Sequence, residues 1–252
     1  WCNSYLGEIQ VIYSKYTMAR KGKLKKSKTK DENSRPFRPR RYKVFMLIVC
    51  EDQNTEPYYF RQFKQLFAEE TVFLKEIGTG KKPLGIVKQA IAERQELSGL
   101  SKRTVDFVWV VFDKDDEGNN EKTLLSFDEA WNLAKSENIE IAFSNEVFEL
   151  WLLLHFCEVS SAESIPRSFI YARLGKEISS IEAYSTFVYD HKKSDPEKVI
   201  GAVMAFGNES TAIERAEKLL DAQKDKQPIK ANPSTTVHLL VKKLRELIEY
   251  YQ

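Results

Sequence analysis

Short apolar runs recur along the chain from residue 42 onward, each bounded by polar or glycine-containing segments. The first, YKVFMLIVC, is nearly continuous and rich in β-branched residues, which is typical of a strand buried on both faces. DFVWVVFD is the clearest of the later runs. The runs that predict strands are residues 42–50, 71–77, 106–113 and 139–143.

Amphipathic stretches lie between these runs. Phe60, Phe63 and Phe67 repeat at helical spacing, after a turn in which Asn54 or Thr55 can cap a helix. Further helices are expected over residues 84–97, 124–138 and 148–156. Strands that alternate with helices predict an α/β fold with a parallel sheet and right-handed crossovers.

The domain organisation follows from where this alternation stops. From about residue 160 the pattern becomes mainly helical, and no internal repeat or long Gly/Ser linker interrupts the chain. We therefore expect an α/β domain over residues 42–158 and a mainly helical extension over 159–252 that packs on it. Residues 1–41 are expected to form a basic, disordered arm. Within the arm, residues 1–17 are expected to be upstream sequence, because Met18 resembles a natural start.

Acidic residues follow two of the predicted strands. The carboxyl ends of parallel strands meet at one edge of a sheet, which is where ligands bind in such folds. Carboxylates gathered there repel one another unless a cation joins them, and oxygen-only ligands suit Mg²⁺ or Mn²⁺. Acidic residues are also common in ordinary turns, so the prediction of a metal site rests on two clusters occurring together. The clusters are Glu51, Asp52 and Glu56 after the first strand, and Asp113, Asp115 and Asp116 after the third.

Charge is unevenly distributed. Residues 19–43 carry twelve Lys or Arg against two acidic residues, although the whole chain has a formal net charge of only +2. Basic arms favour nucleic acid through counterion release, and a solubilising tail is the equally weighted alternative. The residues expected to contact nucleic acid are Arg38, Arg40, Arg41 and Lys43.

Composition excludes several other classes of protein. The longest apolar runs are far shorter than the roughly 20 residues that a membrane helix needs. The three cysteines are widely spaced and odd in number, so neither a disulfide framework nor a zinc site is expected. Cys50 and Cys157 are interpreted as small core residues of a cytoplasmic protein.

Four segments resemble, in the same order, the signature segments of RloB-like proteins. The third is the most specific, because its run from Phe148 to Phe156 matches the family pattern throughout. The segments are VCEDQNTEPYYF (49–60), FDKDD (112–116), SNEVFELWLLLHF (144–156) and NPSTTVHLLVKKL (232–244).

The resemblance implies a Toprim-like, Rossmann-like fold, because RloB-like proteins are assigned to the Toprim superfamily. The hallmark Glu after the first strand corresponds to Glu51, and the Asp-x-Asp pair corresponds to Asp113 and Asp115. These three residues are implied to be catalytic and to bind Mg²⁺ or Mn²⁺, with Asp116 as a further candidate ligand. Glu51 would act as a ligand or as general base for water.

The implied function is metal-dependent cleavage of phosphodiester bonds in DNA or RNA. RloB genes accompany restriction-modification loci and abortive-infection systems of the AbiL type in prokaryotes. They often lie beside a gene for an ABC/AAA-like ATPase, which is therefore the expected partner.

The sequence departs from the family pattern at two positions. Asp52 occupies the position of a family Gly, and Glu146 that of a family Pro. A Gly would permit positive φ or close approach of a phosphate, whereas Asp52 adds negative charge beside the expected site. Asp52 would therefore either add a metal ligand or weaken substrate binding.

Secondary candidates surround this core of the site. Glu56 is either a ligand or an ordinary acidic residue at a helix N-terminus. The resemblance makes Glu149 a neighbour of the active site, whereas His155 is expected to be structural. The cluster of His191, Lys192 and Lys193 either contacts a phosphate or forms a solvated turn.

Two rival interpretations stay open. The protein is alternatively a non-catalytic nucleic-acid-binding or regulatory subunit of a defence complex. A receiver-like phosphoacceptor domain is the lesser alternative, because Asp113 follows the third strand and Ser144 the fourth. Such a domain would need a Lys after a fifth strand, and no convincing one is found.

Overall fold

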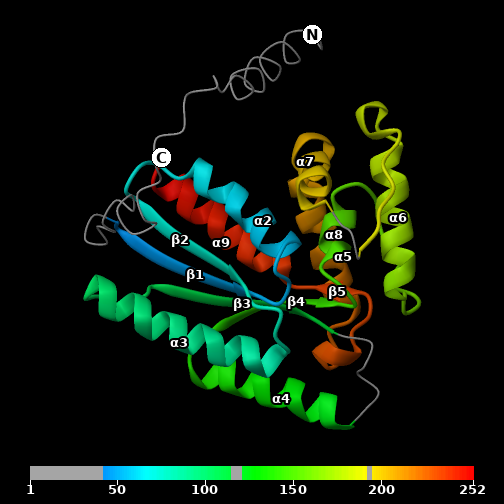
Figure 1. Cartoon of the computed structure of the whole chain (residues 1–252). Helices are drawn as coiled ribbons and strands as arrows, with labels where there is room; N and C mark the ends of the chain where they lie inside the picture. The colour runs from blue at the N-terminus through cyan, green and yellow to red at the C-terminus, as the bar shows by residue number, and fades with distance from the viewer. Residues whose placement is uncertain (1–41, 115–120, 192–194) are drawn as a thin grey trace, which may run out of the picture. The chain divides into compact units, whose positions relative to one another are not determined.

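A five-stranded sheet runs through the protein in the order β2-β1-β3-β4-β5 (Figure 1). The first four strands pair in parallel, and β5 pairs antiparallel with β4. The computed structural model describes residues 42–114, 121–191 and 195–252, all of which belong to one compact unit, Pro39–Gln252. The strands are β1 (Val44–Cys50), β2 (Val72–Gly78), β3 (Phe107–Asp113), β4 (Glu140–Asn145) and β5 (Ser234–Thr235).

The central strand, β1, is buried along its whole length. Its alternate side chains enter two different cores, since Met46 and Ile48 pack on one side of the sheet and Leu47 and Val49 on the other. This arrangement explains the continuous apolar run, because a strand covered on both faces has no polar side. The prediction of a doubly buried strand is confirmed.

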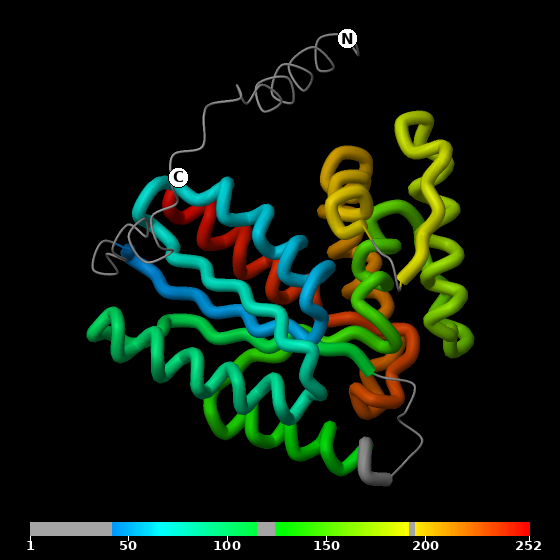
Figure 2. The backbone as a smooth tube through the Cα atoms, in the orientation of Figure 1, coloured from blue at the N-terminus to red at the C-terminus, as the bar shows by residue number. Residues whose placement is uncertain are grey.

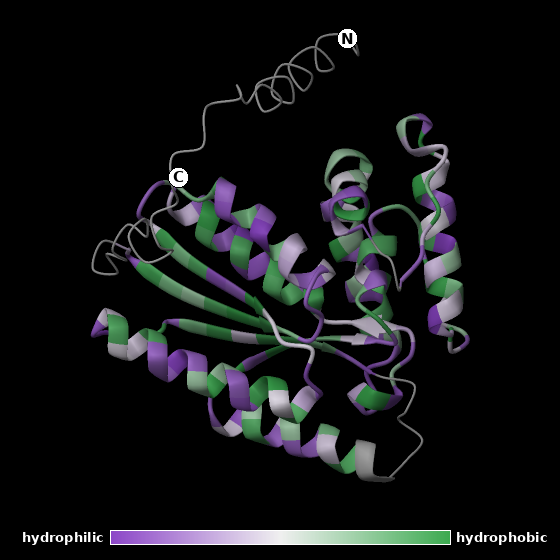
Figure 3. Ribbon diagram, viewed as in Figure 1, coloured by the Kyte–Doolittle hydropathy of each residue, from purple (hydrophilic) through white to green (hydrophobic). Residues whose placement is uncertain are grey.

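Helices cover both faces of the sheet. α3 (Pro83–Ser101) and α4 (Glu121–Ser136) lie together on one face, and α2 (Thr55–Arg61) and α9 (Val237–Tyr250) lie on the other (Figure 1). Figure 3 shows the strands between them as largely hydrophobic and the outer faces of the helices as largely hydrophilic. The predicted α/β, Rossmann-like class is confirmed.

A second group of helices gathers at the end of the sheet toward which β1 and β3 run, as Figure 2 shows. α5 lies at the centre of this group, and all five of its residues from Leu150 to Leu154 are buried. This explains why the segment is apolar all round rather than along one stripe. The helices are α5 (Glu149–Leu154), α6 (Arg167–Ser179), α7 (Pro196–Phe206) and α8 (Glu209–Ala222).

The C-terminal segment returns to the sheet. Ser144 of β4 is paired with Thr235 of β5, and their hydroxyl oxygens lie 3.0 Å apart. The backbone N–H of Thr236 donates to the carbonyl of Phe143 at 2.8 Å. The part of the chain after residue 158 therefore contributes a strand as well as helices, and the domain boundary expected there stays a prediction.

One helix differs from the sequence-based expectation. The helix expected through Phe67 is α-helical only to Arg61 and continues as a 3₁₀ helix, η2 (Gln62–Leu66). Tightening of this kind is common where a helix ends. Within the described part of the chain, no helix is both long and apolar enough to span a bilayer.

Candidate functional site

The turn that follows β1 is held by its own side chains. The Asp52 carboxylate accepts hydrogen bonds from the backbone N–H groups of Gln53 at 2.7 Å and Thr55 at 2.5 Å. In return, the backbone N–H of Asp52 donates to the carboxylate of Glu56 at 3.1 Å. This reciprocal arrangement resembles a capping box and starts α2. Of the two expected caps, Asn54 makes no capping hydrogen bond through its side chain, and Thr55 is the first residue of the helix itself.

Asp52 therefore has a structural role at the position of the family Gly. Asp52 is not one of the described residues that have a positive φ. The turn therefore does not need the conformational freedom of glycine at this position. Both of its carboxylate oxygens already accept backbone N–H groups. This favours a capping function for Asp52 over the additional metal ligand considered from the sequence.

Glu51 and Asp113 lie next to each other at the carboxyl ends of β1 and β3. The Glu51 carboxylate accepts a hydrogen bond from the backbone N–H of Asp113 at 3.0 Å. The Asp113 carboxylate accepts one from the backbone N–H of Phe148, at the start of α5, at 2.8 Å. The two strand ends and α5 are thus joined through two carboxylates, as the parallel topology requires.

Glu56 completes the carboxylate group in this part of the chain. Its side chain is buried, and burial together with the charges of Asp113, Glu51 and Asp52 holds its pKa well above the usual value. Burial is the larger cause of this rise in pKa, and the charges of the neighbouring carboxylates add to it. A bound cation would offset their repulsion, and all the donor atoms are oxygens of the kind that Mg²⁺ or Mn²⁺ prefers.

Asp52, Glu56 and Asp113 line a pocket of about 250 Å³ at the carboxyl edge of the sheet, whereas Glu51 is not among its lining residues. Part of its lining comes from the acidic turn after β1 and from the end of β3. The rest comes from the start of α5, from α6 and from the segment before residue 192. The lining residues are Asp52, Asn54, Thr55, Glu56, Asp113, Phe148, Glu149, Tyr171 and His191.

Glu149 lies in the pocket wall, where the resemblance placed it. The hydroxyl of Tyr189 donates a hydrogen bond to its carboxylate. Burial raises the pKa of Glu149, and the Tyr189 hydrogen bond opposes that rise. The sequence analysis missed Tyr189 and Tyr171, because no periodic or motif signal connects these tyrosines with the acidic residues.

Several sequence candidates lie outside the described residues. Asp115 and Asp116, which complete the Asp-x-Asp-Asp segment, are among them, as are Lys192 and Lys193. Arg38, Arg40 and Arg41 also fall outside. In the described ranges, no group of three or more His, Cys, Asp or Glu side chains is arranged to hold a metal ion.

Lys43 is the one of the four predicted nucleic-acid contacts that lies in the described part of the chain. It is exposed just before β1, at the opposite end of that strand from Glu51, and its ammonium lies 5.4 Å from the ring centre of Tyr251. A nucleic acid that contacted both Lys43 and the acidic pocket would therefore have to extend along the length of the sheet.

Glu146, at the position of the family Pro, is part of a buried link between distant segments. Its carboxylate accepts a hydrogen bond from the Asn232 side chain at 2.9 Å and lies 3.5 Å from the Lys114 ammonium. Asn232 also bonds both backbone groups of Ile165. The segments SNE (144–146) and NPST (232–235) are thus in contact, and the Asn232 side chain links them to the backbone of Ile165.

His155 has the structural role expected from the sequence. Its imidazole is buried, its Nδ1 lies 3.0 Å from the carbonyl of Trp151, and its ring packs edge-on against the Trp151 ring at 4.7 Å. Burial lowers the pKa of His155 to about 4.

The loop Gly78–Lys82 supports the acidic turn. The backbone N–H of Gly80 donates to the carbonyl of Glu51 at 2.7 Å. A Cβ atom on Gly78 would lie 2.5 Å from the carbonyl oxygen of Asp52. The loop therefore packs its backbone directly against the turn.

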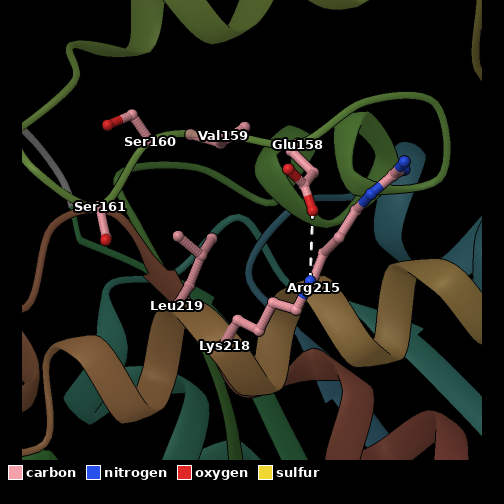
Figure 4. Close-up of a pocket in the computed structure, with 7 residues that line it drawn as sticks. All are labelled: Glu158, Val159, Ser160, Ser161, Arg215, Lys218 and Leu219. Atoms are coloured by element: carbon pink, nitrogen blue, oxygen red, sulfur yellow. Dashed lines mark hydrogen bonds and ion pairs between the residues drawn. The ribbon is translucent and has the colours of Figure 1, made fainter.

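A second pocket, of about 320 Å³, lies between α8 and the segment after α5 (Figure 4). Its two cations are already engaged: the Lys218 ammonium pairs with Glu158 at 3.3 Å, and the Arg215 guanidinium donates to the carbonyl of Leu154 at 2.6 Å. The remaining lining residues are Val159, Ser160, Ser161 and Leu219. None of these residues was a sequence candidate, and we assign this pocket no function.

The fold and the pocket together define a Rossmann-like α/β protein with a carboxylate-rich site at the carboxyl edge of its sheet. Comparison with protein families identifies the group. The chain belongs to the RloB-like family. The model of this family, described as RloB-like protein, matches residues 46–244. No curated protein and no solved structure matches the chain.

Proposed function

We propose that this protein is a metal-dependent nuclease of the Toprim type that cleaves phosphodiester bonds in nucleic acid. The observation that carries the proposal is the hydrogen-bonded contact between Glu51 and Asp113 beside the buried Glu56. Membership of the RloB-like family supports it, because the resemblance aligns these same two residues with the Toprim Glu and the first Asp of its Asp-x-Asp pair.

Glu51 and Asp113 would hold Mg²⁺ or Mn²⁺, together with Asp115, which lies outside the described residues. The metal would supply Lewis-acid stabilisation of the phosphate and lower the pKa of bound water. The chain fixes the orientation of its two described ligands through the backbone N–H groups of Asp113 and Phe148. Burial favours the neutral form of Glu56, which reduces the negative charge that an approaching phosphate meets.

The proposed setting is prokaryotic anti-phage defence of the abortive-infection type, in the cytoplasm, with an ABC/AAA-like ATPase as partner. The family assignment supports this setting, because the resemblance associates such proteins with restriction and abortive-infection loci. An ATPase partner would supply the regulation that a nuclease harmful to its own cell needs.

The receiver-like alternative is not supported by the sheet. That alternative requires a fifth parallel strand followed by a Lys, whereas the strand beside β4 is the antiparallel pair Ser234–Thr235. It also gives no role to the contact between Glu51 and Asp113.

The test is cleavage by the purified full chain, alone and with the neighbouring ATPase. Labelled tRNA, plasmid and single-stranded DNA are each incubated with Mg²⁺, Mn²⁺ or chelator. We expect cleavage only with metal, and a loss of at least about 100-fold in Glu51→Gln and Asp113→Asn proteins. Asp221→Asn is the matched control, because Asp221 is an exposed carboxylate on α8.

Two results would contradict the nuclease. Cleavage that persists in chelator, or an equal rate in the Glu51→Gln and wild-type proteins, would remove the metal site from the mechanism. Tight binding of these nucleic acids without cleavage in any metal, with the ATPase present, would instead support the non-catalytic subunit.

A further inference from the structure

Three aromatic rings lie against one another beside the acidic pocket. Tyr171 of α6 stacks on His191 with ring centres 4.9 Å apart and planes 7° apart. Tyr171 also stacks on Tyr189, at 5.5 Å and 29°. Tyr189 and His191 come from the segment after the 3₁₀ helix η4 (Glu182–Tyr184), so two separate parts of the chain build the stack.

Contacts with α5 and α6 fix the stack in position. The Tyr189 hydroxyl donates to the carboxylate of Glu149, which is in the first turn of the buried helix α5. On α6, Gly175 leaves room for Tyr189, because a Cβ atom there would lie 3.0 Å from the Tyr189 Cβ. The rings are therefore held in place without a ligand, which lowers the entropy cost of binding one.

The stack belongs to the same pocket as the carboxylates. Tyr171 and His191 line it together with Asp113 and Glu56. His191 is exposed and Tyr171 is partly buried, so solvent reaches this aromatic wall. The exposed end of an aromatic stack thus stands next to a strongly acidic group of residues.

This combination has a direct chemical meaning for a nucleic-acid substrate. Carboxylates repel the phosphate that approaches them, so a contact with another part of the substrate would add affinity to whatever a bound metal supplies. A nucleobase has an uncharged π-face, and stacking on aromatic side chains is the common way in which proteins hold unpaired bases. Bases inside a duplex already stack on their neighbours and are not accessible in this way.

We propose that the outer end of this stack, formed by His191 and backed by Tyr171, binds an unpaired nucleobase adjacent to the cleaved phosphate, so that the substrate is a single-stranded or locally unpaired nucleic acid. This role of the stack rests on the proposed nuclease function only for the cleavage step. The binding step stands on the aromatic wall itself.

The test uses short single-stranded RNA and DNA oligonucleotides that carry 2-aminopurine, whose fluorescence falls when it stacks on an aromatic ring. Binding to the full chain is measured in Ca²⁺, and the integrity of each oligonucleotide is checked on a gel. We expect quenching with both single strands, weaker binding of the matched duplex, and weaker binding of an oligonucleotide with an abasic site in place of the stacked base. The RNA and DNA arms show which backbone the pocket prefers.

Variants separate stacking from general packing. Tyr171→Leu removes the ring on which His191 stacks and should weaken binding of the single strand by between about 5- and 150-fold, the range expected for one lost stacked base, and Tyr171→Trp should restore it. Phe169→Leu is the matched control, because Phe169 is an exposed aromatic on the same helix that does not line the pocket. His191→Ala, at an exposed position, gives a second variant that leaves the core intact.

The outcomes distinguish the two proposals. Equal affinity and equal quenching in the wild-type, Tyr171→Leu and His191→Ala proteins would overturn the base-binding wall, even if metal-dependent cleavage is observed. Tyr171-dependent quenching in a protein that cleaves nothing would support the wall and count against the nuclease. A preference for duplex over single strand would also overturn the inference.

Discussion

The carboxylate of Glu51 accepts a hydrogen bond from the backbone N–H of Asp113 at 3.0 Å. The residue that follows β1 therefore helps to hold the end of β3, in addition to the ladder between the two strands. A change at Glu51 should consequently affect the stability of the fold as well as any chemistry at the site, and the two effects are separable.

The Gln and Ala variants of Glu51 should differ in their free energy of unfolding. Glu51→Gln keeps a carbonyl oxygen that can accept the Asp113 N–H, whereas Glu51→Ala leaves that donor without this acceptor. We expect the free energy of unfolding to fall by about 1–2 kcal/mol more in Glu51→Ala than in Glu51→Gln. Urea denaturation in chelator measures the difference, with the exposed Glu158→Ala as control. Equal stabilities would mean that the hydrogen bond contributes nothing.

Metal binding should appear as a stability change. A ligand that binds only the folded state at about 100 times its dissociation constant stabilises by about 2.7 kcal/mol, which corresponds to several degrees in melting temperature for a protein of this size. We expect Mn²⁺ or Mg²⁺ to raise the melting temperature of the wild type but not of Asp113→Asn. The Asp221→Asn protein should respond as the wild type does, and chelator should reverse the rise. An equal response in Asp113→Asn would place any bound metal elsewhere.

Two glycines give a matched pair of substitutions. A Cβ on Gly78 would lie 2.5 Å from both the Asp52 carbonyl oxygen and the Gln53 Cα, so Gly78→Ala must displace the acidic turn. We expect a loss of about 1–3 kcal/mol or more, the usual cost of overpacking. A Cβ on Gly99, in α3, would meet nothing within 4 Å, and Gly99→Ala should be neutral or stabilising by up to about 1 kcal/mol. Thermal or urea unfolding checks both, and an unharmed Gly78→Ala protein would contradict the packing of this loop.

Acid should destabilise the protein partly through His155. Burial lowers its pKa to about 4, below the ordinary value of 6.5, so the unfolded chain takes up a proton before the folded chain does. The stability that the neutral imidazole contributes is therefore present above about pH 6.5 and is lost as the pH falls toward 4. Between pH 7 and pH 4 the wild type should lose about 3 kcal/mol more than His155→Gln, by linkage.

Urea denaturation across this range measures that difference. Comparison of wild type and variant at each pH cancels the contribution of the carboxylates that both proteins share. His191→Gln is the control at an exposed position. Parallel pH profiles for wild type and His155→Gln would show that His155 is protonated equally easily in the folded and unfolded chains.

Burial is the reason that the main elements could be predicted from the sequence. β1 and β3 are covered on both faces, so their runs of apolar residues stand out, and the adjacency of Glu51 and Asp113 follows from their positions at the carboxyl ends of parallel strands. Neither inference needs information about loop conformation.

Other features left weaker signals. The strand β5 has two residues and is defined by its partner rather than by its own composition. Asp52 caps α2 in place of Asn54, and several adjacent polar residues could have filled that role. The contact between Tyr189 and Glu149 spans 40 positions and depends on how separate helices pack, for which no local pattern exists.

The pairing of β4 with β5 also sets an order of events during synthesis. Thr235 follows Ser144 by 91 positions, so the ribosome delivers β4 long before the strand that closes its edge. Until then, Glu146 lacks Asn232, and Asn145 lacks the carbonyl of Ile229 that its side chain binds. A nascent chain thus carries Glu51 and Asp113 well before α5 gains its contacts with α8 and β5.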